Sequence, residues 1–354
     1  MSKLNILRSE MAKLGLDAVV ILDELNQCYL SNFAFTDGLL FITANKAYMV
    51  TDFRYYEMAL NGADKEFEIL MPEARTAYLG NLLSDHSCKR VGFEGISVSY
   101  ATYKGYCERY PNIEWVNIND TIEQIRRIKT PEEIEIMQKA QDITDCAFSH
   151  ILNVINPNMT EIEVAAELEY AMRRAGAAGF AFETIAVSGD ASALPHGTPR
   201  NVKLKNGFLT MDFGAKYMGY CSDMTRTIVI GKADHEIKKL YNTVLKAQLA
   251  AIDFIKAGCD CGEADKIARD IIDVDYKGRF GHSLGHSVGL FIHELPGMSM
   301  KAFGKKLEKG NVVTVEPGIY LLGKYGCRIE DMVAVTDDGI YNFTKSTKEL
   351  IEII

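Results

Sequence analysis

Residues 281–294 of the chain read Gly-His-Ser-Leu-Gly-His-Ser-Val-Gly-Leu-Phe-Ile-His-Glu. Glycine recurs there at every fourth position, as Gly281, Gly285 and Gly289. Each glycine inside a helix costs about 1 kcal/mol relative to alanine. The spacing therefore predicts an extended backbone that another part of the protein approaches closely.

The same stretch holds three of the seven histidines of the chain, His282, His286 and His293. On a strand, residues four apart share a face, so His282 and His286 are expected to point the same way. His293 has the opposite parity and needs a bend or bulge to join them. One such imidazole would be read as an ordinary hydrogen-bonded side chain, but three together favour a site for metal binding or proton transfer.

Composition sets the class of protein. With 354 residues, the chain exceeds what one core usually supports, which predicts two domains. Hydrophobic and charged contents of 47% and 25% are those of a globular protein, and the net charge of −9 argues against nucleic acid or an anionic membrane as partner. No apolar signal core or membrane-length apolar run is present, and eight cysteines lack a framework spacing. We therefore expect a cytoplasmic protein with reduced thiols.

Local signals divide the chain in two. Apolar residues at helical spacing from Leu4 to Leu14, followed by Gly15, predict an N-terminal helix, and apolar runs predict strands at 18–22, 39–43 and 47–51. Thr130 and Thr160 each precede a glutamate by three residues, a capping box that starts a helix. Two more helices are expected at 234–257 and 262–276. We predict an α/β domain over residues 1–126 and a second, α+β domain over residues 127–354.

The second domain contains a weak internal duplication. Each half has two helices and then an apolar strand, 205–214 in the first half and 309–318 in the second. Asp212 and Glu316 occupy the same place in these strands, two residues after a threonine and two before a glycine. The pattern predicts two pseudo-symmetric halves, each bringing one acidic strand to a shared centre.

Further carboxylates follow each acidic strand. A hairpin that closes at Tyr217 and Met218 would pair Asp212 directly with Asp223, and Glu330 is the counterpart of Asp223 in the second half. One of these acids could be a solvated strand residue, but their neighbours are apolar or aromatic. Buried acids in such numbers need cations, and four carboxylates with one imidazole are a ligand set for two divalent ions in a hydrolase. Oxygen-rich ligation favours Mn²⁺, Co²⁺ or Fe²⁺ over a thiolate-type zinc site.

These motifs resemble the family of prolidase, aminopeptidase P and methionine aminopeptidase. The resemblance covers the whole chain and implies a creatinase-type N-terminal domain followed by a pseudo-symmetric pita-bread catalytic domain. It implies that Asp212 chelates one metal ion, that His286 and Glu316 chelate the other, and that Asp223 and Glu330 bridge them. The metals expected are Mn²⁺ or Co²⁺, with Fe²⁺ or Zn²⁺ as alternatives.

The resemblance also implies the roles of supporting residues. A hydroxide bridging the metal ions would attack the scissile carbonyl, with His293 stabilising the oxyanion and Glu316 carrying the proton to the leaving nitrogen. His196 and His282 would orient the substrate, and Arg328 would hold Glu330. The pocket for the residue after the cut, proline in prolidases and aminopeptidases P, would be lined by Phe182, His196 and Ile292.

The expected substrates are therefore peptides with proline in the second position, cleaved by a homodimer. Many prolidases place an arginine after the His-Glu-x-Pro segment, where this chain has Gly297. That difference leaves both the dipeptidase and the aminopeptidase open. Two other functions also stay open: a non-catalytic peptide-binding or scaffolding protein on the same fold, and a hydrolase of a non-peptide amide.

Overall fold

The computed structural model describes residues 2–354, which form two compact units, one up to Arg126 and the other over Arg127–Ile354. Within the described residues, no helix is both long and apolar enough to cross a membrane. Each unit has its own sheets and its own hydrophobic clusters.

The N-terminal unit is built on one mixed sheet of six strands in the order β4-β3-β2-β1-β5-β6. Its strands are β1 Ala18–Ile21, β2 Leu39–Thr43, β3 Ala47–Val50, β4 Phe67–Leu70, β5 Arg90–Phe93 and β6 Glu114–Asn117. Its helices are α1 Lys3–Leu14, α2 Glu24–Ser31, α3 Phe53–Gly62, α4 Arg75–Asp85, α5 Tyr100–Arg109 and α6 Thr121–Arg126. The predicted α/β architecture is confirmed, and Gly15 ends α1 in the left-handed conformation at φ 64°.

Four long helices organise the second unit: α7 Pro131–Val154, α8 Glu161–Arg174, α9 His235–Phe254 and α10 Cys261–Tyr276. Both predicted capping boxes are present. The hydroxyls of Thr130 and Thr160 accept the backbone N–H of Glu133 and Glu163, and the two glutamates accept the backbone N–H of the threonines. Each box satisfies two donors that a bare helix end would leave unpaired.

The strands of the second unit form short, mainly antiparallel sheets. The first half contains β7 Gly179–Phe180, β8 Ile185–Ser188, β9 Gly207–Phe213, β10 Ala215–Tyr217, β11 Tyr220–Cys221 and β12 Met224–Ile230. The second contains β13 Gly285–Ser287, β14 Glu294–Met298, β15 Val312–Val315, β16 Gly318–Leu321, β17 Tyr325–Arg328, β18 Asp331–Val335, β19 Ile340–Asn342 and β20 Glu352–Ile353. The two main sheets run β20-β12-β9-β8 and β14-β13-β15-β18-β19.

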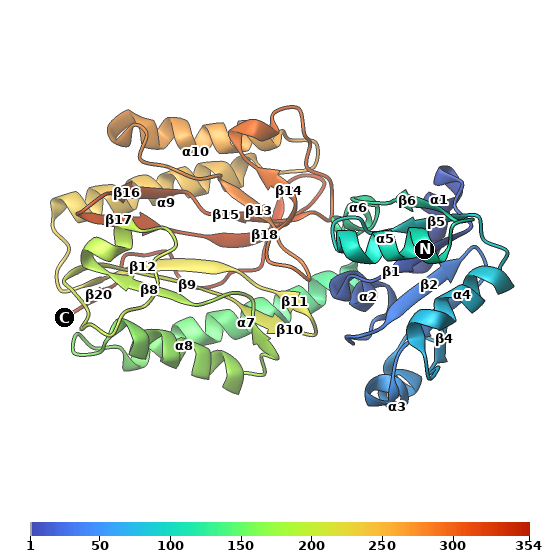
Figure 1. Cartoon of the computed structure of the whole chain (residues 1–354). Coiled ribbons are helices and arrows are strands. Elements are labelled where there is room, and N and C mark those ends of the chain that lie inside the picture. Colours follow the sequence, from blue (N-terminus) through green and yellow to red (C-terminus); the bar gives the residue numbers. More distant parts are fainter. Residues whose placement is uncertain (1) are drawn as a thin grey trace. The chain divides into compact units, whose positions relative to one another are not determined.

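The predicted pseudo-symmetry is visible in the layers of this unit. Helices α7 and α8 cover the outer face of the sheet of β8, β9 and β12, and α9 and α10 cover the sheet of β15 and β18 from the other side (Figure 1). The apolar residues of each helix pair pack into a separate cluster with their own sheet. In both halves a strand leads into a small hairpin, after which the chain returns beside that strand, as β9 to β12 and as β15 to β18. The sheet that contains β9 and β12 and the sheet that contains β15 and β18 therefore lie between the two helix pairs and face each other.

Candidate metal centre

The first acidic strand lies in a hairpin whose turn differs from the prediction. Tyr217 pairs with Tyr220, so the turn residues are Met218 and Gly219, both with positive φ. The ladder then places Asp212 opposite Thr225. The prediction that Asp212 faces Asp223 directly is wrong by two residues, because a turn needing two positive φ values is best made where Gly219 supplies one of them.

The two aspartates still share one face of the sheet. Asp223 lies two residues from Thr225, so it is the diagonal neighbour of Asp212 across the strand pair. The second half is different, because Val315 pairs with Asp331, and one further step of that register brings Glu316 opposite Glu330. Strands from both halves thus direct four carboxylates to one centre.

The glycine-rich stretch supplies the imidazoles. Gly285 begins β13, where an added Cβ would lie 2.0 Å from the backbone oxygen of Thr314. The predicted close approach is confirmed at Gly285 and also at Gly289, whereas nothing lies within 4 Å of an added Cβ at Gly281. Close packing therefore does not explain why residue 281 is a glycine.

His293 joins His286 through a bend over residues 289–293. The two ring centroids lie 4.4 Å apart in a T-shaped arrangement. The register of β13 and β14 is also irregular between Gly285 and Ser287. The expectation that a bend or bulge brings His293 to the other imidazoles is confirmed for His286.

Ligand atoms of Asp223, His286 and Glu330 all lie within 4.8 Å of one another. Nε2 of His286 is 3.5 Å from Oδ2 of Asp223 and 3.4 Å from Oε1 of Glu316. The carboxylates come from β9, the segment before β12, and the ends of β15 and β17, so no local stretch of sequence could form the cluster alone.

Burial and mutual repulsion make this cluster unfavourable without a cation. Burial, reinforced by the neighbouring carboxylates, raises the pKa of Asp223 and of Glu330 well above the usual range. Burial likewise raises the pKa of Glu316 to about 8, although the Arg328 guanidinium opposes the shift. Burial lowers the pKa of His286, so its imidazole is held neutral and can act as a ligand.

Asp212 provides independent evidence for cation binding at this centre. Its Oδ1 is buried and has no hydrogen-bond partner among the described residues. A carboxylate oxygen left unsatisfied inside a protein is costly unless an ion or water meets it. The donor set and this orphaned oxygen together fit divalent cations at this centre.

Arg328 has a different partner from the one expected. Its Nη2 donates to Oδ2 of Asp212 at 2.6 Å, rather than to Glu330. Its Nε donates to the hydroxyl of Thr225 at 3.0 Å, and that hydroxyl donates to Oε2 of Glu330 at 2.7 Å. The hydrogen-bonded connection from Arg328 to Glu330 therefore runs through Thr225.

Tyr320 connects Arg328 to His282. Its hydroxyl accepts from Nη1 of Arg328 at 2.8 Å and lies 2.9 Å from Nε2 of His282. Burial and the charge of Arg328 lower the pKa of His282 to about 4, so its ring is neutral. With Nδ1 donating to the backbone oxygen of Ser283 at 2.9 Å, Nε2 must accept from the tyrosine.

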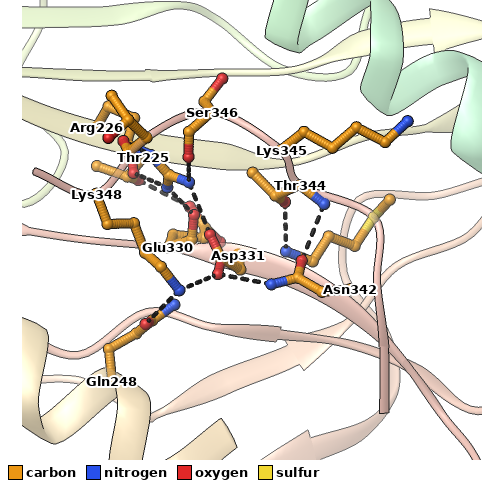
Figure 2. Close-up of polar contacts among 12 residues, drawn as sticks. Thr225, Arg226, Gln248, Glu330, Asp331, Asn342, Thr344, Lys345, Ser346 and Lys348 are labelled. Atoms are coloured by element: carbon orange, nitrogen blue, oxygen red, sulfur yellow. Dashed lines mark hydrogen bonds and ion pairs between the residues drawn. The ribbon is translucent and has the colours of Figure 1, made fainter.

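The buried ion pair of Arg226 and Asp331 holds the backbone at Glu330. Figure 2 shows Asp331 bonded to Arg226, Lys348 and Asn342. Nη1 of Arg226 also donates to the backbone oxygen of Glu330 at 2.5 Å. Although burial opposes ionisation, the two cations lower the pKa of Asp331, so its negative charge is retained. The network fixes the backbone from which the Glu330 side chain projects.

A cavity of about 580 Å³ opens over this centre. It is lined by every site residue that the sequence predicted: Phe182, His196, Asp212, Asp223, His282, His286, Ile292, His293, Glu316, Arg328 and Glu330. The structure thus brings the expected ligands and the expected substrate-pocket residues to one concave site.

Sequence reasoning missed Thr225, Tyr320 and Thr314, whose hydroxyl donates to Oε1 of Glu316 at 3.0 Å. A signal for two of them was present. Thr225 follows Asp223 by two residues and Thr314 precedes Glu316 by two, and residues two apart share a face when the backbone is extended.

Carboxylates and imidazoles around a cavity define a candidate metal-dependent hydrolase. Comparison with known families agrees, because residues 135–337 match Metallopeptidase family M24 and residues 3–128 match the Creatinase/Prolidase N-terminal domain. The chain belongs to metallopeptidase family M24 and carries a creatinase-type N-terminal domain before its pita-bread catalytic domain.

Individual relatives match over nearly their whole length. The chain is 38% identical to the Xaa-Pro dipeptidase of Pyrococcus furiosus, covering 95% of this chain and 96% of the relative. A solved Xaa-Pro dipeptidase from Bacillus anthracis has a TM-score of 0.95 at 42% identity, covering 99% of both chains. A solved X-Pro aminopeptidase from Thermotoga maritima has a TM-score of 0.92 at 34% identity, covering 100% of both.

Proposed function

We propose that this metallopeptidase hydrolyses the bond between an N-terminal residue and proline, with two divalent metal ions held by Asp212, Asp223, His286, Glu316 and Glu330. The observation that carries the proposal is the convergence of these five side chains under one cavity together with the predicted proline pocket. The similarity to Xaa-Pro dipeptidases and an X-Pro aminopeptidase supports it. We favour Mn²⁺ or Co²⁺, because the ligands are mainly carboxylates.

The bound metal ions would supply a nucleophile from water near neutral pH and polarise the scissile carbonyl. His293 faces the same space, and burial lowers the pKa of its imidazole. As a neutral ring it has one N–H to donate to the oxyanion that develops in the transition state. We assign this role to His293 because it lies against His286 at the cavity wall.

Glu316 is the proposed proton carrier to the leaving nitrogen. Its Oε1 accepts the hydroxyl of Thr314, which leaves Oε2 as the oxygen that takes the proton. His282 has both ring nitrogens engaged, so we propose that it positions Tyr320 and Arg328. Substrate orientation is then assigned to His196.

The cavity lining favours longer peptides over dipeptides. Among residues 2–354, Arg328 is the sole lysine or arginine that lines it, and that guanidinium is paired with Asp212. A dipeptide would bring its C-terminal carboxylate next to the proline pocket, where a free cation would be needed. Gly297 offers none, although a residue from a partner subunit of the expected homodimer could.

The test uses metal-stripped protein with and without added Mn²⁺ or Co²⁺, and a matched dipeptide Xaa-Pro and tripeptide Xaa-Pro-Yaa. Metal-dependent cleavage with preference for the tripeptide supports an aminopeptidase, and cleavage of the dipeptide alone supports a prolidase. Asp223→Asn should abolish both. If wild-type protein binds metal and cleaves neither peptide, the Xaa-Pro assignment is wrong, and binding or hydrolysis of another amide replaces it.

A further inference from the structure

A buried ion pair lies beneath the bend that carries Ile292 and His293. Nζ of Lys129 is 3.2 Å from Oε2 of Glu294, and their side chains are only 1% and 8% exposed. Glu294 ends the glycine-rich stretch, yet it neither lines the cavity nor belongs to the candidate ligands. Neither metal binding nor the lining of the pocket therefore explains why the charged Glu294 side chain is buried here.

The bend is folded around the Glu294 carboxylate. The backbone N–H of Phe291 donates to Oε1 at 3.1 Å, and that of Gly289 donates to the backbone oxygen of Phe291 at 3.1 Å. A Cβ added at Gly289 would lie 2.4 Å from Oε2. The carboxylate thus fills the space that the bend encloses, so its position and that of residues 289–293 are linked.

Lys129 is itself held at a fixed place. Its backbone N–H donates to the backbone oxygen of Gly310 at 2.8 Å. Its Nζ also lies 3.4 Å from the hydroxyl of Ser287, the residue that pairs with Glu294 between β13 and β14. The ammonium group is therefore anchored below the two strands that flank the bend.

We propose that the Lys129–Glu294 pair is a positioning device that fixes the bend, and with it His293 and Ile292, over the metal centre. Removing one charge from a buried ion pair takes an opposite charge away from its partner, which then takes up a proton, moves or admits water. Each response shifts the carboxylate that the Phe291 amide binds. His293 and Ile292 follow, because they lie between Phe291 and Glu294.

The experiment compares wild type with Lys129→Met, Lys129→Arg and the double variant Lys129→Met/Glu294→Gln. Lys309→Met is the matched control, because Lys309 makes an exposed ion pair with Asp337. Hydrogen exchange of the backbone amides in residues 289–294, bound metal, and kcat and KM for an Xaa-Pro tripeptide are measured on each protein.

In Lys129→Met, exchange in the bend should rise about tenfold or more, as expected for loss of one charged hydrogen bond. Turnover should fall about 100-fold, mainly in kcat, because small displacements of catalytic groups cost that much. Metal content should stay unchanged, Lys129→Arg should recover part of the loss, and Lys309→Met should behave as wild type.

Wild-type exchange and kcat in Lys129→Met would overturn the proposal, as would a loss of metal equal to the loss of activity. If Lys129→Met does not fold, the double variant decides, because it removes both charges. It should fold with faster exchange in the bend and reduced kcat, and wild-type values in it would refute the positioning role. The kinetic part rests on the proposed function. If wild type cleaves no Xaa-Pro peptide, that function fails, while the exchange measurement still tests the ion pair.

Discussion

Replacing Thr225 by valine removes a hydroxyl and keeps the branched shape of the side chain. That hydroxyl donates to Glu330 and accepts from Arg328, at 2.7 and 3.0 Å, in a fully buried position. A hydrogen bond to a charged group contributes about 1.5–3 kcal/mol. Without metal, the raised pKa of Glu330 favours its neutral carboxyl, so only the bond from Arg328 involves a charged group, and the bond to Glu330 contributes about 1 kcal/mol. Metal-free Thr225→Val should therefore lose roughly 3 kcal/mol of unfolding free energy, and its Tm should drop by about 8 °C for a unit of this size.

The same change should weaken metal binding. The hydroxyl orients the Glu330 carboxylate, and loss of such a supporting partner costs about 10–100-fold in metal affinity. Titration calorimetry of the metal-free protein with Mn²⁺ or Co²⁺ measures this change, and differential scanning calorimetry measures the Tm. Both are independent of catalytic turnover.

Thr227→Val is the matched control, two residues along the same strand. The Thr227 hydroxyl is also buried, but its partners are neutral: it donates to the backbone oxygen of Arg328 at 2.8 Å, accepts from the backbone N–H of Arg328 at 3.3 Å and lies 3.1 Å from the hydroxyl of Thr210. Thr227→Val should lose about 2–3 kcal/mol of unfolding free energy and retain its metal affinity. Equal metal affinities in the two variants would refute the role assigned to Thr225.

Three further outcomes are expected. Gly285→Ala places a methyl 2.0 Å from a backbone oxygen and should cost about 3 kcal/mol or more and lower metal content, whereas Gly281→Ala meets nothing within 4 Å and should leave the Tm unchanged. Asp331→Asn removes the carboxylate that balances the charge of the buried Arg226 guanidinium and should cost about 3–5 kcal/mol in denaturant unfolding, against less than about 1 for Asp337→Asn at the surface. Burial raises the pKa of Glu94 to about 7 from 4.5, so the folded state keeps a proton that the unfolded chain has lost, and the N-terminal unit should lose about 3 kcal/mol as pH rises through that window. Proteolysis of the native protein across this pH range should show the slope in wild type and no slope in Glu94→Gln.

Features that depend on neighbouring residues were predictable from the sequence. Thr130 and Thr160 correctly predicted the first residues of two helices, because all the residues of a capping box lie within four positions of the sequence. The close approach at Gly285 was also foreseen, since a glycine inside a strand has few other physical reasons. The face shared by the strand carboxylates followed from the period of two residues in a strand.

Features that depend on distant residues were not predictable in the same way. Arg328 donates to Asp212, which is 116 residues away in sequence, and no local pattern distinguishes that carboxylate from Glu330. Lys129 lies 165 residues before Glu294, and its burial beside a carboxylate appears only when β14 is in place. Such pairs form only when the two halves of the second unit pack against each other.

The error in the Asp212 hairpin shows why the predicted site survived. The true turn displaces the partner of Asp212 by two residues, from Asp223 to Thr225, and an even displacement keeps every side chain on its face of the sheet. A displacement by one residue would have turned Asp223 away from His286 and removed it from the cluster. The prediction of a metal centre therefore depended on the parity of the strand positions and not on the register itself. In the observed register Thr225 lies opposite Asp212, and its hydroxyl accepts a hydrogen bond from Arg328 and donates one to Glu330.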